Sequence, residues 1–541
     1  MNTHRRFPRI AVPAALLLGS ALALSACAAT TPGTSTAPTN DTLVYASGDA
    51  EPTCLDPHVG GNYPQSLLAS QFLEQLVSQD KNGDIKPWLA KAWTTSPDGL
   101  TWTFTVADNV KFSDGTPLDA AAVVRNIEHV KDPETKSSTG YLALAKVEKA
   151  TATDTNTVTL NLSQPDSALL ESLSQPWLAI ESPAGLARSQ DENCQAPIGT
   201  GAFVVDSWKR QDSVQLSRNP HYTTGNGEAA LAKISWRFIP DSATRIAALR
   251  SGDVQIIDNA QPDTIASSAA SDDIKHLDAP RPGSVNRIEF NSSRGPLADE
   301  RVREALVRGV DVNAGIKTLF FGTATRSYSP LSSVEKLGYS EPKLFDTDVA
   351  AAKKLLDDAG WVPGTDGIRE KDGQKLTLAF PVSTNQSIPA EQSLFEQIQQ
   401  QAKGLGIAIT ITPLDLSSWY EALGKNEYDL VSAPYTKVGP DVLRILYHSA
   451  GITPAPSGYF ANHAQVNLPA LDDLLTRAAE TGDQTERASL YEQAQKTILE
   501  GYYILPLYDQ QNHFLYSGKL KGVGEVNSVG NPLLRGVSFA G

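Results

Sequence analysis

The alternation of strand-like and helix-like segments along the chain is the feature that most constrains its fold. Every second residue from Leu100 to Val106 is apolar, which predicts a half-buried strand. Asp119 stands where it can cap a helix whose apolar stripe runs from Val123 to Val130. The same patterns predict strands at Val158 to Leu162, Ile234 to Phe238 and Val254 to Ile257, and helices at Leu67 to Leu76 and from Asp241 to Gly252. The chain is therefore expected to be a mixed α/β protein.

The second half follows the order strand, helix, strand. A strand is expected at Leu376 to Val382, a helix at Glu391 to Leu405 and a strand at Ile407 to Ile411. This order favours a parallel pair of strands joined by a crossover helix. The 541 residues exceed what one hydrophobic core normally holds, so at least two lobes are expected.

The first residues have the order of an export signal. A positive stretch ending at Arg9 precedes an apolar run from Ile10 to Leu24, and that run is too short to span a bilayer. The following Leu-Ser-Ala-Cys resembles the lipobox of bacterial lipoproteins, which predicts a signal peptide at residues 1–26 and a lipid on Cys27. Residues 27–41 are rich in Thr and have too few apolar side chains to fold, which is typical of a flexible tether.

The charge of the chain limits its partners. The precursor has a formal net charge of -15, and the leader contains three arginines and no acidic residue, so its removal leaves about -18. Such a surface argues against binding to nucleic acid or to an anionic bilayer. Any contact with a membrane is expected through the lipid.

Two further cysteines lie beyond Cys27. In an oxidising compartment Cys54 and Cys194 are predicted to form a disulfide, and the alternative is a pair of buried free thiols.

No pattern of catalytic or metal-binding residues stands out. The eight histidines are scattered without a close pair at ligand spacing, and no third cysteine remains for zinc, so neither a metal nor a cofactor is expected. Two Ser-x-x-Lys matches lack the partner motifs of penicillin-binding enzymes, and there is no Gly-x-Ser-x-Gly. The chain is not expected to be an enzyme, and a secreted hydrolase is the remote alternative.

Several short motifs occur in an order that is similar to one known family. The motifs are Leu55-Asp56-Pro57, Pro87-Trp88-Leu89-Ala90, Ser96-Pro97-Asp98-Gly99, Val110-Lys111-Phe112-Ser113-Asp114-Gly115, Gly199-Thr200-Gly201, Arg218-Asn219-Pro220, Arg301-Val302-Arg303-Glu304 and Tyr428-Asp429-Leu430. On these motifs the chain from about residue 43 to 525 resembles the family 5 extracellular solute-binding proteins, which include dipeptide, oligopeptide and nickel receptors of ABC importers.

The resemblance implies a two-lobed clamshell of the periplasmic-binding-protein type, with an extra subdomain in lobe I. Lobe I is expected at 42–282 plus 510–541, with the subdomain at about 76–194, and lobe II at 283–509. The chain would be a monomer that binds a small molecule or peptide between the lobes and delivers it to an ABC permease on the outer face of the membrane.

The resemblance also indicates where the ends of a peptide ligand would bind. In dipeptide-binding members an aspartate after the motif matching Tyr428-Asp429-Leu430 pairs with the amino terminus, and an arginine on an earlier lobe II loop pairs with the carboxylate. The corresponding positions here are about Thr436 and Thr384, and neither is charged. A shift of one or two residues would bring Lys437 or Asp441 into play instead.

The expected ligand is therefore an oligopeptide or peptide-like compound, and the alternatives are a chelated metal or siderophore and a neutral glycan. Aromatic and amide side chains suit a cleft that binds such ligands. For each candidate the alternative is packing in the core or a place on a surface loop. The candidate ligand contacts are Asn62, Tyr63, Asn385, Trp419, Tyr435, Thr436, Lys437, Asp441, Tyr459, Phe460 and Asn462.

Overall fold

The computed structural model describes residues 41–80, 82–224, 229–269, 271–384 and 387–540. The predicted signal peptide, Cys27 and all of the tether except Asp41 lie outside the described residues, as does the candidate contact Asn385. Within the described part, no helix has the length and apolar character needed to cross a bilayer.

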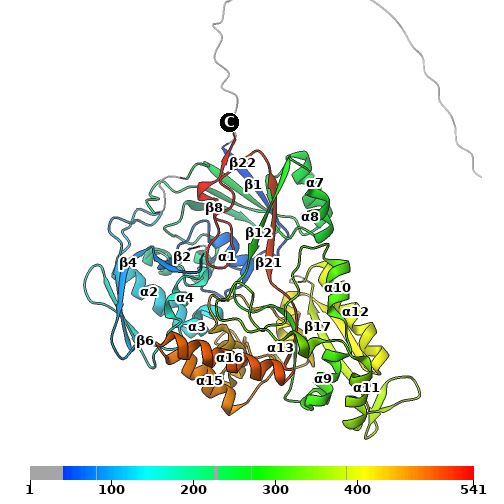
Figure 1. The fold of residues 1–541 in the computed structure, drawn as a ribbon. Helices are drawn as coiled ribbons and strands as arrows, with labels where there is room; N and C mark the ends of the chain where they lie inside the picture. Colours follow the sequence, from blue (N-terminus) through cyan, green and yellow to red (C-terminus); the bar gives the residue numbers. More distant parts are fainter. Residues whose placement is uncertain (1–40, 81, 225–228, 270, 385–386, 541) are drawn as a thin grey trace, which may run out of the picture. The chain divides into compact units, whose positions relative to one another are not determined.

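A seven-stranded mixed sheet, called the large sheet, contains strands from both ends of the chain (Figure 1). Its central strand β1 (Thr42–Ser47) runs parallel to β10 (Lys233–Phe238) and to β11 (Ile256–Ile257). The other pairs are antiparallel and give the order β12-β21-β11-β1-β10-β9-β8. The remaining strands of this sheet are β8 (Phe203–Lys209), β9 (Ser213–Arg218), β12 (Ile274–Pro280) and β21 (Gln511–Ser517).

Helices cover both faces of the large sheet. The side chains of β1 point to the two faces in turn and pack in two different cores. Leu43 and Tyr45 pack in the core that contains α1 (Tyr63–Ala69), whereas Ala46 packs in the core of α7 (Ser242–Ser251) and α8 (Pro262–Ser268). Asp241 caps α7, and Gly252 ends it in the left-handed conformation, as the sequence predicts.

A four-stranded antiparallel sheet, called the small sheet, is formed by the part of the chain between β1 and β8. Its order is β4 (Ala90–Thr95), β5 (Thr101–Val106), β7 (Thr157–Leu162) and β6 (Val147–Ala152). The strands predicted from the alternating patterns are β5 and β7, and both are confirmed. Helix α2 (Ala120–Lys131) packs on this sheet and is capped by Asp119, whose Oδ1 accepts from Ala122 N at 2.8 Å. Short elements here are β2 (Val77–Gln79), β3 (Ile85–Pro87), α3 (Thr139–Ala143), α4 (Leu169–Leu173), α5 (Pro183–Leu186) and α6 (Gln190–Gln195).

The second half has its own apolar core, called the second-half core, which extends from Ile288 to Tyr508. The predicted parallel pair is confirmed: β17 (Thr377–Ser383) and β18 (Ala408–Leu414) are joined by α12 (Pro389–Leu405). A second sheet places β13 (Asn286–Phe290) between β19 (Leu430–Ser432) and β20 (Ile504–Tyr508), all antiparallel.

The remaining elements of the second half are mostly helices. They are α9 (Glu300–Arg308), α10 (Val312–Leu319), α11 (Val349–Asp358), α13 (Leu416–Gly424), α14 (Val442–Tyr447), α15 (Pro469–Glu480), α16 (Gln484–Glu500) and the short strands β14 (Val362–Pro363), β15 (Arg369–Lys371) and β16 (Gln374–Lys375). The chain ends with β22 (Leu520–Lys521) and β23 (Ser538–Phe539).

The chain passes twice between the large sheet and the sheet of β13. The first passage, Arg281 to Val285, leads from β12 to β13, and the second, Asp509 and Gln510, leads from β20 to β21. The two passages are hydrogen-bonded to each other, since Arg281 N donates to Gln510 O at 3.0 Å and Gln510 Nε2 donates to Ser284 O. The two connections between the sheets therefore lie side by side.

One predicted helix is shorter than expected, and the cause is a close contact between two backbones. Helix α1 ends at Ala69, and Phe72 O, which would accept from the next turn of a longer helix, accepts from Gly201 N at 3.1 Å. A Cβ on Gly201 would lie 2.5 Å from the carbonyl carbon of Phe72, so only glycine permits this approach. The predicted strand at Val254 to Ile257 is likewise reduced to β11.

The predicted disulfide is present between Cys54 and Cys194. It joins the loop after β1 to α6, 140 residues further along the chain.

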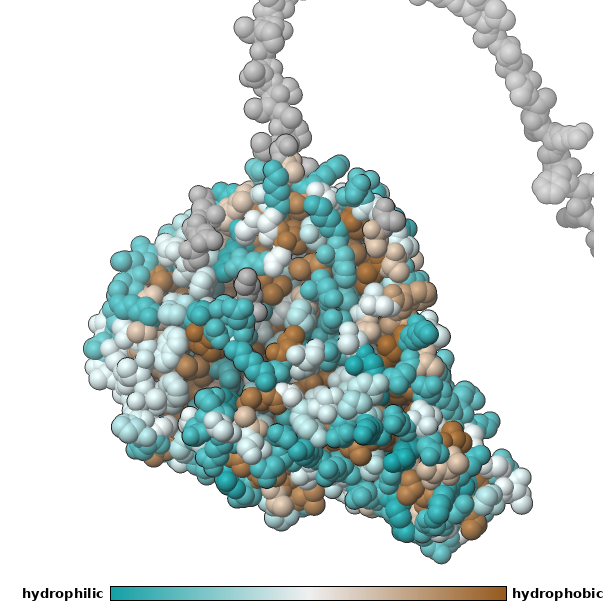
Figure 2. Space-filling view, in the orientation of Figure 1, coloured by the Kyte–Doolittle hydropathy of each residue, from teal (hydrophilic) through white to brown (hydrophobic). Residues whose placement is uncertain are grey.

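Hydrophilic residues predominate on the face of the molecule shown in Figure 2, and apolar residues are scattered among them, as a chain with a net charge of -15 leads one to expect.

Candidate ligand-binding cleft

A cleft of about 1200 Å³ lies beside the two passages of the chain. One wall comes from the large-sheet side and includes Gly48–Glu51, Gly60–Pro64, Arg245 and Arg281. The other comes from the second half of the chain and includes Thr384, Leu416–Ser417, Tyr420–Glu421 and Pro434–Thr436. Because both walls contribute side chains, a molecule held here would contact both parts of the chain.

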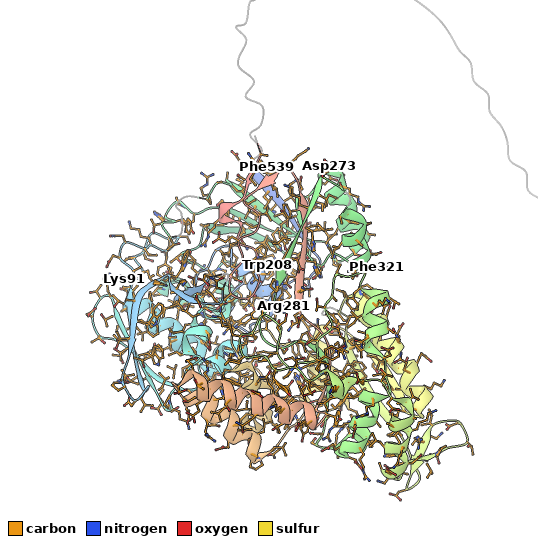
Figure 3. The ribbon with its side chains drawn as sticks, viewed as in Figure 1. Lys91, Trp208, Asp273, Arg281, Phe321 and Phe539 are labelled. Atoms are coloured by element: carbon orange, nitrogen blue, oxygen red, sulfur yellow. A yellow bond between two sulfur atoms is a disulfide. The ribbon has the colours of Figure 1, made fainter. Side chains whose placement is uncertain are left out.

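Arg281 joins the two walls. It follows β12 directly, at the end of the strand opposite to Asp273 (Figure 3). Its guanidinium carbon lies 3.8 Å from the ring centroid of Tyr63, and its Nε donates to Thr436 Oγ1 at 3.0 Å. Desolvation lowers the pKa of Arg281, but guanidinium groups remain protonated in proteins. The cleft therefore holds a fixed positive charge.

An acidic group lies on the same wall. Asp258 accepts hydrogen bonds from Ser47 Oγ and Gly48 N, each at 2.6 Å, and its neighbour Asp49 accepts from Asn259 Nδ2. Burial, together with the charge of Asp258, raises the pKa of Asp49 to about 7. The side chain of Asp49 can therefore gain or lose a proton near neutral pH.

Aromatic rings line the opposite wall. The rings of Tyr435 and Tyr459 are stacked with centroids 6.4 Å apart, and Tyr420 meets Tyr459 edge-on at 5.9 Å. Phe460 lies on the same wall, and Trp177 lines the cleft from the other wall, beside Gly61. Such rings offer apolar contact area and can accept varied side chains.

Comparison with known proteins identifies the family. The model for bacterial extracellular solute-binding proteins, family 5 (middle region), matches residues 84–455, and the glutathione-binding protein GsiB of Shigella dysenteriae is 30% identical over 486 residues, covering 87% of this chain and 89% of its own. The chain belongs to the family 5 extracellular solute-binding proteins. The nickel-binding periplasmic protein of Escherichia coli is 28% identical and covers 81% of this chain and 83% of its own.

Solved structures of the family share the fold. The dipeptide-binding protein of Pseudoalteromonas sp. SM9913, solved with Met-Leu, has a TM-score of 0.81 at 22% identity and covers 92% of this chain and 100% of its own. The expected two-lobed periplasmic-binding-protein fold is thereby confirmed, as is the role in solute binding. The family consists of binding proteins rather than enzymes.

Six of the predicted ligand contacts of this family member line the cleft. Asn62 caps α1 by accepting from Gln65 N at 3.0 Å, and this cap holds Tyr63 at the start of the helix. Thr384, the predicted position of a carboxylate anchor, also lines the cleft. The six are Asn62, Tyr63, Tyr435, Thr436, Tyr459 and Phe460.

Four others lie away from the cleft-lining set. Trp419 is 2% exposed and packs with Leu423 of its own helix. Asn462 bonds to the backbone of Val466 and His448, which fixes a turn. The other two, Lys437 and Asp441, belong to a buried charge network behind the cleft.

That network joins the two parts of the chain. Lys437 Nζ donates to Ser172 Oγ at 3.2 Å, and Asp441 accepts two hydrogen bonds from Arg444 at 2.9 and 3.0 Å. Arg444 and Lys437 together lower the pKa of Asp441 against the effect of burial. The carboxylate of Asp441 is therefore already paired within the chain.

Arg281, Arg245 and Asp49 were not among the predicted contacts. The sequence could have pointed to Arg281, because this residue precedes Pro282-Gly283, where the sequence pattern changes. For Asp49 and Arg245 nothing in the local pattern distinguishes them from surface charges.

Proposed function

We propose that this chain is the substrate-binding component of an ABC importer and captures a peptide-like solute in the cleft. The observation that carries the proposal is a cleft of about 1200 Å³ that both parts of the chain line and that contains the fixed positive charge of Arg281 between its walls. This volume exceeds the range of about 300–1000 Å³ usual for small-molecule sites, which favours an extended ligand.

Arg281 is the proposed anchor for a ligand carboxylate. Its side-chain hydrogen bonds to Thr436 use its Nε and Nη2 atoms, and it forms no ion pair with a carboxylate among the described residues. A guanidinium has five N–H donors, so donors remain for a bidentate contact with a carboxylate. The uncharged Thr384 and Thr436 support an anchor other than that of the dipeptide receptors.

The relatives bear on the chemistry of the solute. GsiB is named as a glutathione-binding protein, and glutathione is a tripeptide that carries carboxylates. A peptide-like ligand would place one carboxylate on Arg281 and its side chains against the rings of Tyr435 and Tyr459. Asp49, near its point of half-protonation at pH 7, can adapt to an amino group or to a neutral polar group.

The proposed lobes are 42–282 plus 510–541 and 283–509, with the subdomain at about 76–194. The two hydrogen-bonded passages at Arg281–Val285 and Asp509–Gln510 support a hinge there, because motion between the lobes needs only these connections to bend. Closure would bury the ligand, and the closed form would dock as a monomer on a permease. A lipid on Cys27 would keep it at the outer face of the membrane.

A thermal-shift screen tests this function. Tripeptides to octapeptides, metal chelates and neutral oligosaccharides are added separately to the purified chain, and stabilisation should grow with ligand as RT ln(1 + [L]/Kd). Stabilisation by peptides alone supports the proposal. Stabilisation by a chelate or an oligosaccharide instead, or turnover of any compound, would contradict it.

A further inference from the structure

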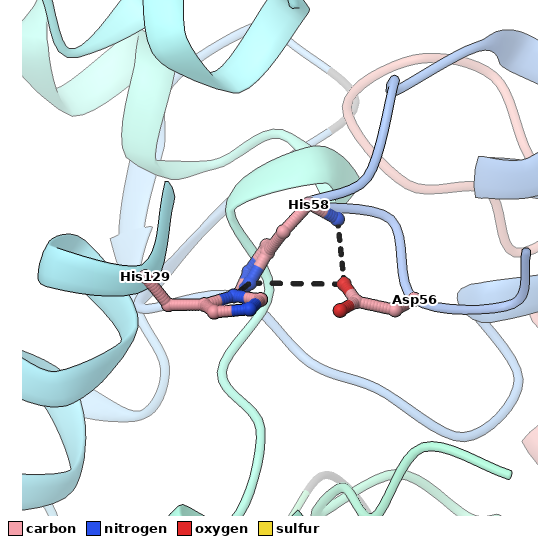
Figure 4. A group of neighbouring side chains, drawn as sticks. All are labelled: Asp56, His58 and His129. Atoms are coloured by element: carbon pink, nitrogen blue, oxygen red, sulfur yellow. Dashed lines mark hydrogen bonds and ion pairs between the residues drawn. The ribbon is translucent and has the colours of Figure 1, made fainter. Parts of the chain in front are cut away.

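Two histidines and one aspartate meet in the small-sheet region, outside the cleft. Asp56 and His58 lie in the loop after the disulfide, and His129 lies on α2 (Figure 4). His58 Nδ1 is 3.1 Å from His129 Nδ1 and 3.8 Å from Asp56 Oδ1. One ligand atom of each residue lies within 4.8 Å of the others, and no other group of this kind occurs among the described residues.

The contacts of His58 fix which of its ring nitrogens carries the proton. Its Nε2 lies 2.8 Å from the carbonyl oxygen of Ala179, which can only accept a hydrogen bond, so Nε2 must be protonated. In the neutral ring Nδ1 is then an acceptor, and in the metal-free chain it accepts a hydrogen bond from His129 Nδ1 at 3.1 Å. A histidine that donates one N–H to a backbone carbonyl and presents the other nitrogen is the usual arrangement of a metal ligand.

The carboxylates of this region lack a balancing cation. Asp56 is 1% exposed and accepts from Asn193 Nδ2 at 3.1 Å, and Asn193 Nδ2 also donates to the fully buried Glu181 at 2.7 Å. Asp56 Oδ1 also accepts from His58 N at 2.8 Å, and neither carboxyl forms an ion pair with Lys or Arg within the described ranges. Arg188 donates to Asn193 and to Ala196 O instead.

We propose that Asp56, His58 and His129 form a structural site for a divalent first-row metal ion, with zinc as the best match. Two imidazole nitrogens and one carboxylate oxygen are ligands that zinc prefers, and solvent would complete the tetrahedron. Ligand atoms on tetrahedral zinc are about 3.3 Å apart. The spacings of 3.1 and 3.8 Å around His58 are close to this value, and the third, between His129 and Asp56, is within 4.8 Å. The ion would also neutralise the buried carboxylate of Asp56.

The position of the site gives the metal a structural role. The loop that carries Asp56 and His58 begins at the disulfide and continues into Gly60–Tyr63, which lines the cleft. Thr139 Oγ1 already bonds Gly61 O at 2.8 Å. Thr139 lies on α3, so a metal bound to His129 would tie the same loop to α2 as well. Bound metal should therefore stabilise the fold and hold Asn62 and Tyr63 in place for the ligand.

The sequence did not indicate the site, because 71 residues separate the two histidines. Metal sites are recognised in sequence by short ligand spacings, and this one depends on α2 packing against the loop.

Zinc binding to the purified, tag-free chain tests the proposal. The chain is treated with a chelator, desalted and titrated with zinc chloride in a calorimeter, and its thermal unfolding midpoint is measured with and without zinc. The wild type should bind one equivalent and unfold at a higher temperature with zinc. His129→Asn should lose at least tenfold in zinc affinity, while its unfolding midpoint without zinc stays close to that of the wild type, because the amide N–H can still donate to His58.

His276→Ala is the matched control. His276 Nε2 lies 3.1 Å from His513 Nδ1, so this pair has the same spacing but is exposed, and the variant should bind zinc as the wild type does. Absence of saturable binding, wild-type affinity in His129→Asn, or loss of binding in His276→Ala would overturn the proposal. If His129→Asn does not fold, zinc X-ray absorption of the wild type decides: two imidazoles in the first coordination sphere support the site, and none or one contradicts it.

Discussion

The guanidinium of Arg281 lies over the ring of Tyr63, with its central carbon 3.8 Å from the ring centroid. Tyr63 begins α1 on the large-sheet side, and Arg281 also bonds Thr436 on the opposite wall of the cleft. A single charged side chain thus contacts both walls at the point where the chain passes from one part to the other. In the proposed function, the bound ligand lies next to Arg281.

Replacing Arg281 should weaken ligand binding. Arg281→Ala removes a charge-assisted contact worth about 1.5–3 kcal/mol, which corresponds to roughly a 10- to 150-fold rise in Kd for a peptide ligand. Calorimetric titration with a peptide ligand from the thermal-shift screen measures this change in Kd. Lys496→Ala removes a cation from the ring of Tyr339, 5.0 Å away, outside the cleft, and should leave the Kd unchanged. Equal losses in both variants would argue against Arg281 as the anchor.

Asp441 is predicted to contribute to stability through the buried network. Asp441→Asn leaves the buried cation of Lys437 and the partly buried Arg444 without their carboxylate, which should lower the free energy of unfolding by about 3–5 kcal/mol. Asp358→Asn breaks the exposed pair with Lys354 and should cost less than about 1 kcal/mol. Urea denaturation of both variants tests the contrast, and similar losses would be inconsistent with a buried network.

Glu391 should make the stability depend on pH. It is 4% exposed on α12, and desolvation raises its pKa to about 8. An acid with a raised folded pKa contributes its full stability below its unfolded pKa of about 4.5 and loses that contribution as pH rises to about 8. Glu391→Gln should therefore gain about 2–4 kcal/mol relative to the wild type between pH 5 and pH 8.

Urea unfolding at the two pH values measures this difference. Glu492→Gln changes an exposed carboxyl on α16 and should follow the wild type at both pH values. A Glu391→Gln variant whose stability changes with pH in parallel to the wild type would rule out a buried, protonated Glu391.

The close backbone contact at Gly201 predicts a strong dependence on residue size. A Cβ there would lie 2.5 Å from Phe72 C, so Gly201→Ala should destabilise the chain by about 1–3 kcal/mol. Gly404 on α12 has open space around its Cβ position, and Gly404→Ala should stabilise by about 0.5–1 kcal/mol. Thermal unfolding of the two variants should show shifts of opposite sign, and a neutral Gly201→Ala would refute the contact.

The elements with strong periodicity could be predicted from the sequence, whereas the charges of the cleft could not. The strand around Phe104 and the parallel pair β17 and β18 follow from local patterns, because one face of each is buried. Asp441 has the appearance of a ligand contact in sequence, yet Arg444 three residues later pairs with it. Arg281 and Tyr63 are far apart in the chain, and only the packing of the large sheet brings them together.

The central claim is that the native protein holds a peptide-like solute through Arg281. Native mass spectrometry of the wild type and of Arg281→Ala, both purified from the original host without denaturation, tests it most directly. The account predicts a wild-type mass that exceeds the protein mass by that of a releasable peptide, and a largely ligand-free Arg281→Ala. An equal mass excess in both proteins, or a released compound that contains no carboxylate, would contradict it.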